Sequence, residues 1–242
     1  MPKRVIPYKE SSLGKKEQVT QMFDKVSSNY DFLNRVLTFG IDVSWRKKVV
    51  QLVADHKAKN ILDIATGTGD LAIMLTEINP DKVIGLDISP GMLEVGKKKI
   101  AQLNLTDKID MVIGDSEKLP FEDHTFDAIT VGFGVRNFEN LEKGLSEIYR
   151  VLKPKGTFVV LETSQPSKFP IKQGFDFYSK YVIPNVGKIF SKDKNAYQYL
   201  PESAAAFPYG EKFNNILLKT GFNTSKVYPQ TFGISTIYQA IK

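Results

Sequence analysis

The chain has 242 residues, 42% hydrophobic and 25% charged, which is enough for one well-packed core with extensions. No apolar run approaches the roughly 18 residues that a membrane-spanning helix needs, so we expect a protein that does not cross a bilayer. Cysteine is absent and only two histidines are present, which excludes disulfides and cysteine nucleophiles. We therefore also expect no protein-bound metal.

The basic excess lies at one end of the chain. The formal net charge is +6, and the first 60 residues hold 12 Lys and Arg against 6 Asp and Glu, whereas the remainder holds 21 of each. The helical spacing of Val19, Met22 and Val26 predicts that residues 1–56 form a basic helical extension. Such a segment could dock on anionic lipid or on nucleic acid, which attract Lys and Arg through long-range fields, and a merely solvated tail is the alternative. Because no apolar signal region opens the chain, we expect a cytoplasmic protein.

Short apolar runs rich in β-branched residues alternate with helical stretches through the middle of the chain. This alternation favours a parallel sheet covered on both faces, because right-handed crossovers place a helix over the sheet each time. We predict a doubly wound α/β fold with a mostly parallel, seven-stranded sheet whose last two strands, in 222–242, form an antiparallel edge pair. The core domain spans 57–163, and 164–221 should insert helices as a lid. The five core strands are predicted at 60–65, 82–88, 109–115, 126–133 and 156–163.

The loop after the first predicted strand reads ATGTGD. In a doubly wound sheet, ligands bind beyond the carboxyl ends of the strands, and Gly67 and Gly69 let this backbone turn tightly and approach a ligand. GTGDLA also fits a dinucleotide-binding pattern, and Asp87 follows about 20 residues on in either case. Asp63 argues against a pyrophosphate, because a carboxylate inside the strand would repel that anion but could help to hold an ammonium group.

Asp115 and Ser116 end the third predicted strand, where they could meet an adenine edge. With the glycine loop, these positions resemble the class I S-adenosylmethionine-dependent methyltransferases over residues 58–163. The resemblance implies S-adenosylmethionine as the cofactor, with the glycine loop around its methionine part, Asp87 on the ribose hydroxyls and Gly132 beside the sulfonium. The implied cofactor-binding residues are Asp63, Thr66, Gly67, Thr68, Gly69, Asp87, Ile88, Asp115, Ser116 and Gly132.

Four separated segments resemble the ubiquinone/menaquinone biosynthesis C-methyltransferase family. They are SSNYDFLNRVLTFGIDVSWRK (27–47), FGVRNF (133–138), RVLKPKGTFVVLETS (150–164) and YQYLPESAAAFP (197–208). The resemblance runs from about residue 20 to the C-terminus. It implies carbon methylation of a prenylated quinol, with demethylmenaquinol favoured over a benzoquinol precursor of ubiquinone. LETS and KPKG replace the family's LEFS and KPGG, and Asp42 replaces a histidine of some members, which leaves fine substrate preference open.

The stretch ITVGFGVRNF (129–138) ends an apparently buried strand in a guanidinium and an amide. Methylation of a quinol carbon needs in-line placement and a stabilised phenolate, not a covalent enzyme intermediate. We therefore predict Arg136, Asn137 and Tyr30 as catalytic residues: Arg136 fixes the phenolate or a proton-accepting water, Asn137 donates to the second ring oxygen, and Tyr30 helps to close the pocket. Residues 169–213 hold 11 of the 27 aromatic residues, which suits a pocket or lid for a prenyl tail.

Other functions fit parts of the sequence. A different small-molecule methyltransferase would share the glycine loop, and a nucleic-acid methyltransferase would suit the pI of 9.2. The N/D-P-P-Y/F motif and a cysteine nucleophile are both absent, however, so we expect no nucleic-acid partner. A catalytically inactive nucleotide-binding module would keep Asp87 but would not require Arg136 and Asn137. The oligomeric state stays open, a homo-oligomer included.

Overall fold

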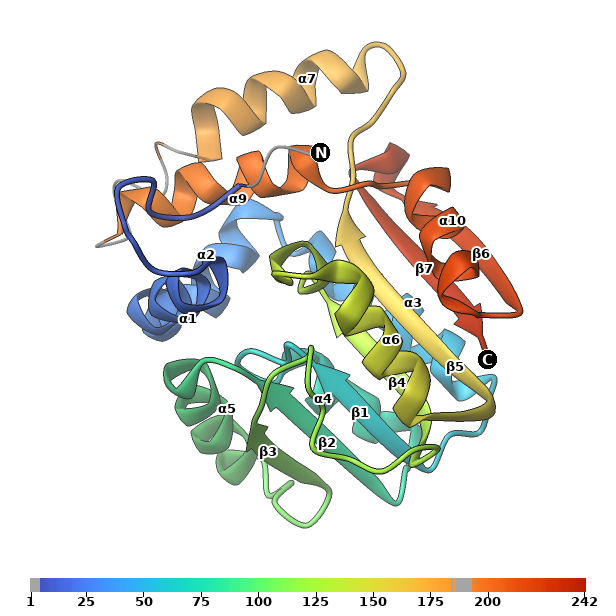
Figure 1. Cartoon of the computed structure of the whole chain (residues 1–242). Helices are drawn as coiled ribbons and strands as arrows, with labels where there is room; N and C mark the ends of the chain where they lie inside the picture. The colour runs from blue at the N-terminus through green and yellow to red at the C-terminus, as the bar shows by residue number, and fades with distance from the viewer. Residues whose placement is uncertain (1–4, 184, 186–192) are drawn as a thin grey trace.

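The computed structural model describes residues 5–183, 185 and 193–242. Its centre is one sheet of seven strands in the order β3-β2-β1-β4-β5-β7-β6 (Figure 1). The first five strands run parallel, and β7 is antiparallel to both β5 and β6, which confirms the predicted sheet with its antiparallel C-terminal pair. The strands are β1 (Asn60–Ile64), β2 (Lys82–Asp87), β3 (Ile109–Ile113), β4 (Phe126–Gly132), β5 (Leu152–Thr163), β6 (Thr224–Gln230) and β7 (Ser235–Ile241).

The central strands are apolar on both faces. Along β1, Ile61 packs into one hydrophobic core and Leu62 and Ile64 pack into the other, as the two-residue period of a strand requires. β1 pairs with β4 so that Leu62 lies beside Ile129, and these side chains are fully buried. Burying each one stabilises the fold by about 1.5 to 3 kcal/mol. Burial on both faces explains why the strands appear as continuous apolar runs in the sequence.

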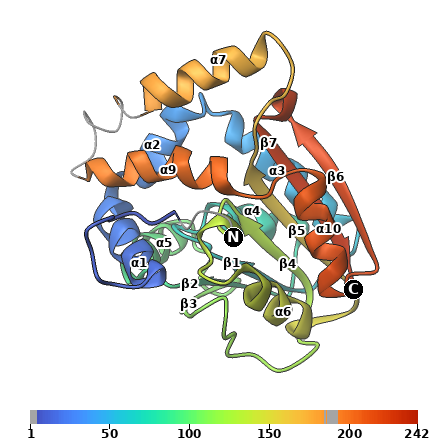
Figure 2. The same cartoon turned by 45° about the horizontal axis from the view of Figure 1, so that its top comes forward.

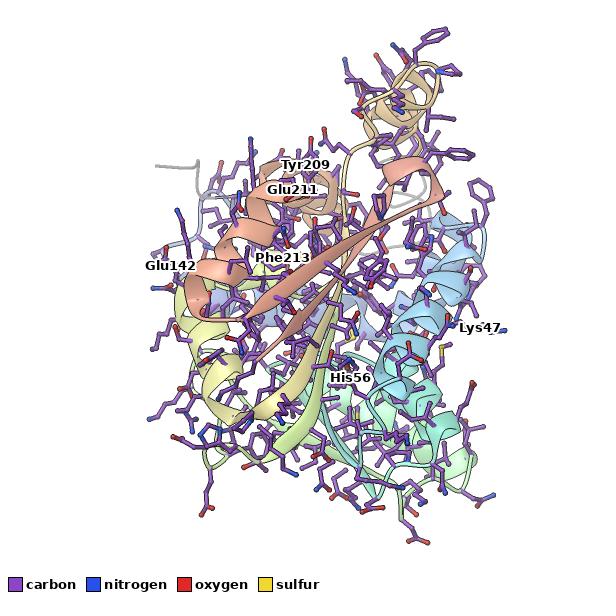
Figure 3. All side chains as sticks on the ribbon, turned by 90° about the vertical axis from the view of Figure 1, so that its right-hand side faces the viewer. Lys47, His56, Glu142, Tyr209, Glu211 and Phe213 are labelled. Atoms are coloured by element: carbon purple, nitrogen blue, oxygen red, sulfur yellow. The ribbon has the colours of Figure 1, made fainter. Side chains whose placement is uncertain are left out.

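Helices cover both faces of the sheet. On one face, α6 and α10 pack through residues such as Ile148 and Phe213, and Figure 3 shows Phe213 on the side of α10 that faces the strands. On the other face, α3 and α4 pack through Val53 and Leu75. The helices are α1 (Lys15–Val26), α2 (Tyr30–Leu37), α3 (Ile41–Ala54), α4 (Asp70–Leu75), α5 (Pro90–Gln102), α6 (Leu141–Val151), α7 (Ile171–Phe177), α9 (Lys194–Ala206) and α10 (Glu211–Thr220). α10 falls in the predicted lid segment, but it packs against α6 and β6 and so belongs to the helices that cover the first face of the sheet.

The N-terminal helices and α9 pack together beyond one edge of the sheet. Met22 of α1, Leu33 of α2, Met92 of α5 and Tyr199 of α9 share a third hydrophobic core. α7 lies beside α9 in both views (Figures 1 and 2). Helices α1 and α2 of the predicted extension and α9 of the predicted lid therefore pack together as one group, whereas α3 covers a face of the sheet. Residues 1–4, 184 and 186–192 of those two segments lie outside the described residues.

The fifth strand begins earlier than predicted. The sequence places it at 156–163, but β5 starts at Leu152, directly after α6. Leu152 pairs with Phe126, and the register then shifts so that Thr157 pairs with Ala128. Residues 153–156 therefore lie inside β5 and interrupt its pairing with β4.

Candidate active site

Two cavities meet at the carboxyl ends of the central strands. A narrow cleft of about 80 Å³ lies beyond β1, β2 and β4, with Gly67, Asp87 and Gly132 in its lining. A larger cavity of about 1030 Å³ lies between α2, α3, α7 and α9. Tyr30 and Phe133 line both cavities. The protein can therefore hold two ligands that meet at these two residues.

The cleft forms where two neighbouring strands end in left-handed backbone. Ala65 after β1 and Phe133 after β4 have φ values of 52° and 59°. Non-glycine residues rarely adopt this conformation, and it clusters at functional sites. The two loops approach closely at Gly134, where a Cβ atom would lie 2.5 Å from the Cβ of Ala65. Gly67 and Gly69 also have positive φ, as the glycine pattern predicts.

Asp87 ends β2 between the glycine loop and the cleft. Its carboxylate oxygens accept hydrogen bonds from the backbone N–H groups of Gly67 at 2.8 Å and Ser89 at 2.9 Å. Burial raises the pKa of Asp87. The residue lines the cleft with Ile88, and each of its oxygens keeps a further lone pair. Asp87 can therefore position the loop and bind a pair of ligand hydroxyls together.

Asp63, which the sequence places near an ammonium group, supports the loop from beneath. Its side chain is buried and is not part of the cleft lining. Its two oxygens accept hydrogen bonds from the hydroxyls of Thr66 and Thr130, each at 2.6 Å. Burial raises the pKa of Asp63 to about 6. Asp63 therefore ties the loop after β1 to β4, and contact with an ammonium group stays a prediction.

Three other predicted loop residues lie outside the cleft lining. Thr66 donates to Asp63, and Thr68 donates from Oγ1 to Asp31 of α2 at 2.5 Å. Lys99 of α5 also binds Asp31, at 2.6 Å, so this part of the loop is held by α2 and α5. Gly69 forms the N-cap of α4. These residues shape the loop, and a direct part in ligand binding stays a prediction.

The far end of the cleft is covered by α1. Asp115 and Ser116 line this end, as expected. Lys16 of α1 reaches across, with Nζ 2.7 Å from Oδ2 of Asp115 and 3.4 Å from Oε2 of Glu117, and Phe23 of α1 also lines the cleft. Sequence reasoning missed this cover, and no local signal could have shown it, because Lys16 and Asp115 lie 99 positions apart.

Arg136 and Asn137 line different cavities. Arg136 lines the large cavity and Asn137 lines the cleft, and both side chains donate to the Phe133 carbonyl between them. Their contact with one quinol ring stays a prediction. Both belong to the short helix η3 (Val135–Asn137), where successive side chains point in different directions. The Asn137 Oδ1 atom accepts a hydrogen bond from the Tyr199 hydroxyl at 3.0 Å, and burial raises the pKa of Tyr199 to about 12.

Arg136 is held in a buried ion pair. Its Nη1 atom lies 2.6 Å from Oε1 of Glu162 and donates to the Phe133 carbonyl, also at 2.6 Å. Burial alone would lower the pKa of Arg136, but the Glu162 carboxylate outweighs that effect and raises it. Among the described residues no hydrogen bond engages Nη2 of Arg136, and its Nε is buried without a partner. Glu162 therefore positions Arg136.

A second buried arginine lines the large cavity. Arg46 of α3 pairs with Asp42, and its guanidinium lies 5.8 Å from the centre of the Phe133 ring. Asp42 also accepts hydrogen bonds from Arg35 at 2.9 Å. Burial raises the pKa of Tyr30, which lies at the junction of the cavities. Sequence reasoning missed Arg46, because a charged residue on an amphipathic helix normally faces solvent.

Comparisons with known proteins show a consistent set of relatives. The model of the ubiE/COQ5 methyltransferase family matches residues 11–242. A demethylmenaquinone methyltransferase of Bacteroides fragilis is 49% identical over 241 residues, covering 99% of this chain and 98% of the relative. One of Porphyromonas gingivalis is 41% identical over 243 residues, covering 100% and 99%. A ubiquinone/menaquinone biosynthesis C-methyltransferase UbiE of Geotalea daltonii is 42% identical over 230 residues, covering 94% and 97%.

Solved structures share the fold at low sequence identity. A putative S-adenosyl-L-methionine-dependent methyltransferase of Methanococcus maripaludis has a TM-score of 0.65 at 22% identity, covering 91% of this chain and 94% of that one. A putative O-methyltransferase of Nostoc punctiforme has a TM-score of 0.68 at 15% identity, covering 96% and 64%. Since the family match and the close relatives both span almost the whole sequence, the chain belongs to the ubiE/COQ5 methyltransferase family.

Proposed function

We propose that this protein transfers a methyl group from S-adenosylmethionine to a ring carbon of a prenylated quinol, with demethylmenaquinol as the substrate. The junction of the two cavities at Tyr30 and Phe133 carries this proposal. A cofactor in the cleft and an acceptor in the large cavity would meet there. Relatives named demethylmenaquinone methyltransferase favour the menaquinone branch, and the benzoquinol precursor of ubiquinone is the alternative.

The groups around the cleft fit S-adenosylmethionine, which when bound supplies an electrophilic methyl group on its sulfonium. Asp87 can accept both ribose hydroxyls, and charge-assisted hydrogen bonds of this kind contribute about 1.5 to 3 kcal/mol each. Asp115 and Ser116 offer acceptors and a hydroxyl donor to the adenine end. Gly132 brings the end of the β4 backbone to the cleft, where the sulfonium end of the cofactor would lie. Asp63 keeps the loop in the shape that the methionine part requires.

The residues that line the large cavity suit stabilisation of phenolate charge. A quinol carbon beside a hydroxyl becomes more nucleophilic when that hydroxyl loses its proton, so a fixed cation near the oxygen favours reaction. Arg136 is already held by Glu162 and needs little reorganisation to offer Nη2. The guanidinium of Arg136 stays protonated, and its pKa is raised further beside Glu162, so Arg136 is no base. We assign it to the phenolate oxygen or to a proton-accepting water. Arg46 supplies a second guanidinium to the same cavity.

Tyr30 and Asn137 take different parts in this proposal. Tyr30 lines both cavities, so it can hold the quinol ring against the methyl donor. Asn137 lines the cleft and is fixed by Tyr199, so we place it on the cofactor side of the junction, and its donation to the second ring oxygen stays a prediction.

The proposed substrate also suggests a location for the protein in the cell. A prenylated quinol is strongly apolar and partitions into membranes, so we propose a cytoplasmic protein that makes peripheral contact with a bilayer. Within the described residues, no helix is both long and apolar enough to cross a membrane. A homo-oligomer stays a prediction.

Transfer of labelled methyl tests the proposed function. The purified protein is given labelled S-adenosylmethionine with reduced demethylmenaquinone or, separately, with the reduced benzoquinone precursor, and products are followed by mass spectrometry. We expect methylation of the demethylmenaquinol ring carbon. Cofactor binding with methylation of neither quinol would indicate the inactive binding module instead. Transfer of the labelled methyl group to RNA would instead support the hypothesis of a nucleic-acid methyltransferase.

A further inference from the structure

Six aromatic side chains are unusually exposed, and five of them, all but Phe32, line the large cavity or stand next in sequence to a residue that does. Phe39, Phe169, Phe177, Tyr181 and Phe232 have exposed fractions between 49% and 81%, and three of them are the most exposed large hydrophobic side chains among the described residues. Large apolar side chains are normally buried, so leaving all five in water is unfavourable. Apolar side chains that gather on one exposed patch mark a binding surface.

These five residues, named here the aromatic rim, lie on three segments that line the large cavity. Phe39 lines the cavity, and the other four adjoin or lie within three residues of lining residues such as Pro170, Tyr178 and Thr231. The Phe39 and Tyr178 ring centres are 6.1 Å apart, which joins the turn between α2 and α3 to the end of α7. Figures 1 and 3 show α7 above the connection between β6 and β7, where Phe232 lies in η5 (Thr231–Gly233). Three distant segments therefore meet at one cavity.

The charge beside the rim is positive. Residues 164–183 contain Lys168, Lys172 and Lys180 against one acidic residue, Asp176. Lys172 pairs with Asp176 at 2.5 Å, and Lys168 and Lys180 are exposed. Aromatic rings flanked by lysines suit the interface of an anionic bilayer, where the rings enter the headgroup region and the lysines attract the anionic lipids.

The basic N-terminal quarter is a weaker candidate for the same contact. Several of its cations are used inside the protein: Lys16 pairs with Asp115, Lys25 with Asp193 and Arg46 with Asp42. Lys16 joins α1 to the loop after β3, Lys25 joins α1 to the start of α9, and the Arg46 pair lies within α3.

We propose that the aromatic rim docks on the surface of an anionic lipid bilayer, so that the large cavity opens directly onto the membrane. This inference rests on the proposed function, since it gives a prenyl tail a route into the cavity without crossing water. A bilayer fits better than a protein partner, because a protein seated on the rim would close the opening through which the substrate must pass.

Flotation with vesicles tests the rim. The vesicles are phosphatidylcholine with or without phosphatidylglycerol, and the test variant is Phe169→Ser/Phe177→Ser/Phe232→Ser, none of which lines the cavity. The matched control, Leu103→Ser/Ile113→Ser/Leu218→Ser, removes three exposed apolar side chains from elsewhere. We expect the parent and the control to float with phosphatidylglycerol vesicles and the rim variant to bind at least tenfold more weakly.

Three flotation and sedimentation outcomes would overturn the proposal. The first is a parent protein that binds neither kind of vesicle, and the second is a rim variant that floats with the vesicles as the parent does. The third is a parent that sediments as a dimer while the rim variant sediments as a monomer, which would assign the face to a second copy of the chain.

Assays with a short-tailed and a long-tailed quinol distinguish an error in the docking proposal from an error in the proposed function. We expect the rim variant to methylate a short-tailed, water-soluble demethylmenaquinol at the parent rate, and a long-tailed quinol in vesicles at least tenfold more slowly than the parent. Equal loss on both substrates would contradict a docking role. A parent protein that floats but methylates neither quinol would refute the proposed function and leave the docking surface supported.

Discussion

The cleft and the large cavity differ in what builds them. The cleft is formed by short loops at the ends of parallel strands, where carboxylates bind backbone N–H groups and threonine hydroxyls. The large cavity is walled by helices from both ends of the chain, and the aromatic rim lies on segments that line it. Sheet register fixes polar groups closely enough to recognise one small cofactor, whereas packed helices can enclose a long apolar tail. The difference predicts which substitutions disturb one cavity and spare the other.

The largest expected effect is at the Arg136–Glu162 pair, beside the large cavity. Removing one partner of a buried ion pair costs about 3 to 5 kcal/mol, so Arg136→Ala should lower the free energy of unfolding by that amount in urea titrations. The double variant Arg136→Met/Glu162→Gln should recover most of this stability. It should bind S-adenosylmethionine like the parent and turn over at least tenfold more slowly. A double variant with parental turnover would reduce Arg136 to a structural role.

The second prediction concerns Asp63 beneath the cleft. Its folded-state pKa is raised from 3.8 to about 6, so the folded protein binds the proton more tightly than the unfolded chain does. The Asp63 contribution to stability therefore falls as pH rises from about 4 to about 6, by roughly 3 kcal/mol at about 1.4 kcal/mol per pKa unit. The free energy of unfolding of Asp63→Asn minus that of the parent should rise through this window and then level off. A difference that does not vary with pH would contradict the raised pKa.

The third prediction separates the two cavities by ligand. Asp87→Ala should weaken S-adenosylmethionine binding by about 1 to 3 kcal/mol in calorimetry, because charged hydrogen bonds to the ribose are lost. Binding of a short-tailed quinol analogue should stay unchanged, since Asp87 does not line the large cavity. Asp110→Ala, which removes an exposed carboxylate from β3, is the matched control. Equal weakening of both ligands would mean that the cavities are not independent.

The smallest effect is expected at Lys16, which covers the cleft. Its ion pair with Asp115 is about 30% exposed on both sides, so Lys16→Ala should change the free energy of unfolding by less than about 1 kcal/mol. If α1 must move to admit the cofactor, the association rate constant of S-adenosylmethionine should rise a few-fold in stopped-flow measurements. Lys9→Ala removes the exposed pair with Glu202 and serves as the control. An unchanged rate would show that this ion pair does not control entry to the cleft.

The sheet and much of the cleft were predictable because their signals are local. Gly67 marks the loop that needs positive φ, and Asp87 follows a strand that is apolar on both faces. The start of β5 was misplaced because the turn before it resembles the end of a helix, whereas Leu152 already pairs with Phe126. Arg136 was found as a polar end to a buried strand, but its separation from Asn137 depends on the turn of η3.

The sequence by itself determined the fold class, the family resemblance and the polar residues at the strand ends. These follow from the two-residue period of strands, from the backbone freedom of glycine and from motifs read along the chain. Only the tertiary structure decided that Arg136 pairs with Glu162, that Arg46 faces the large cavity and that distant aromatic residues lie beside one cavity. The physical reason is that such contacts join residues from separate segments, and packing, not local propensity, selects which side chains meet.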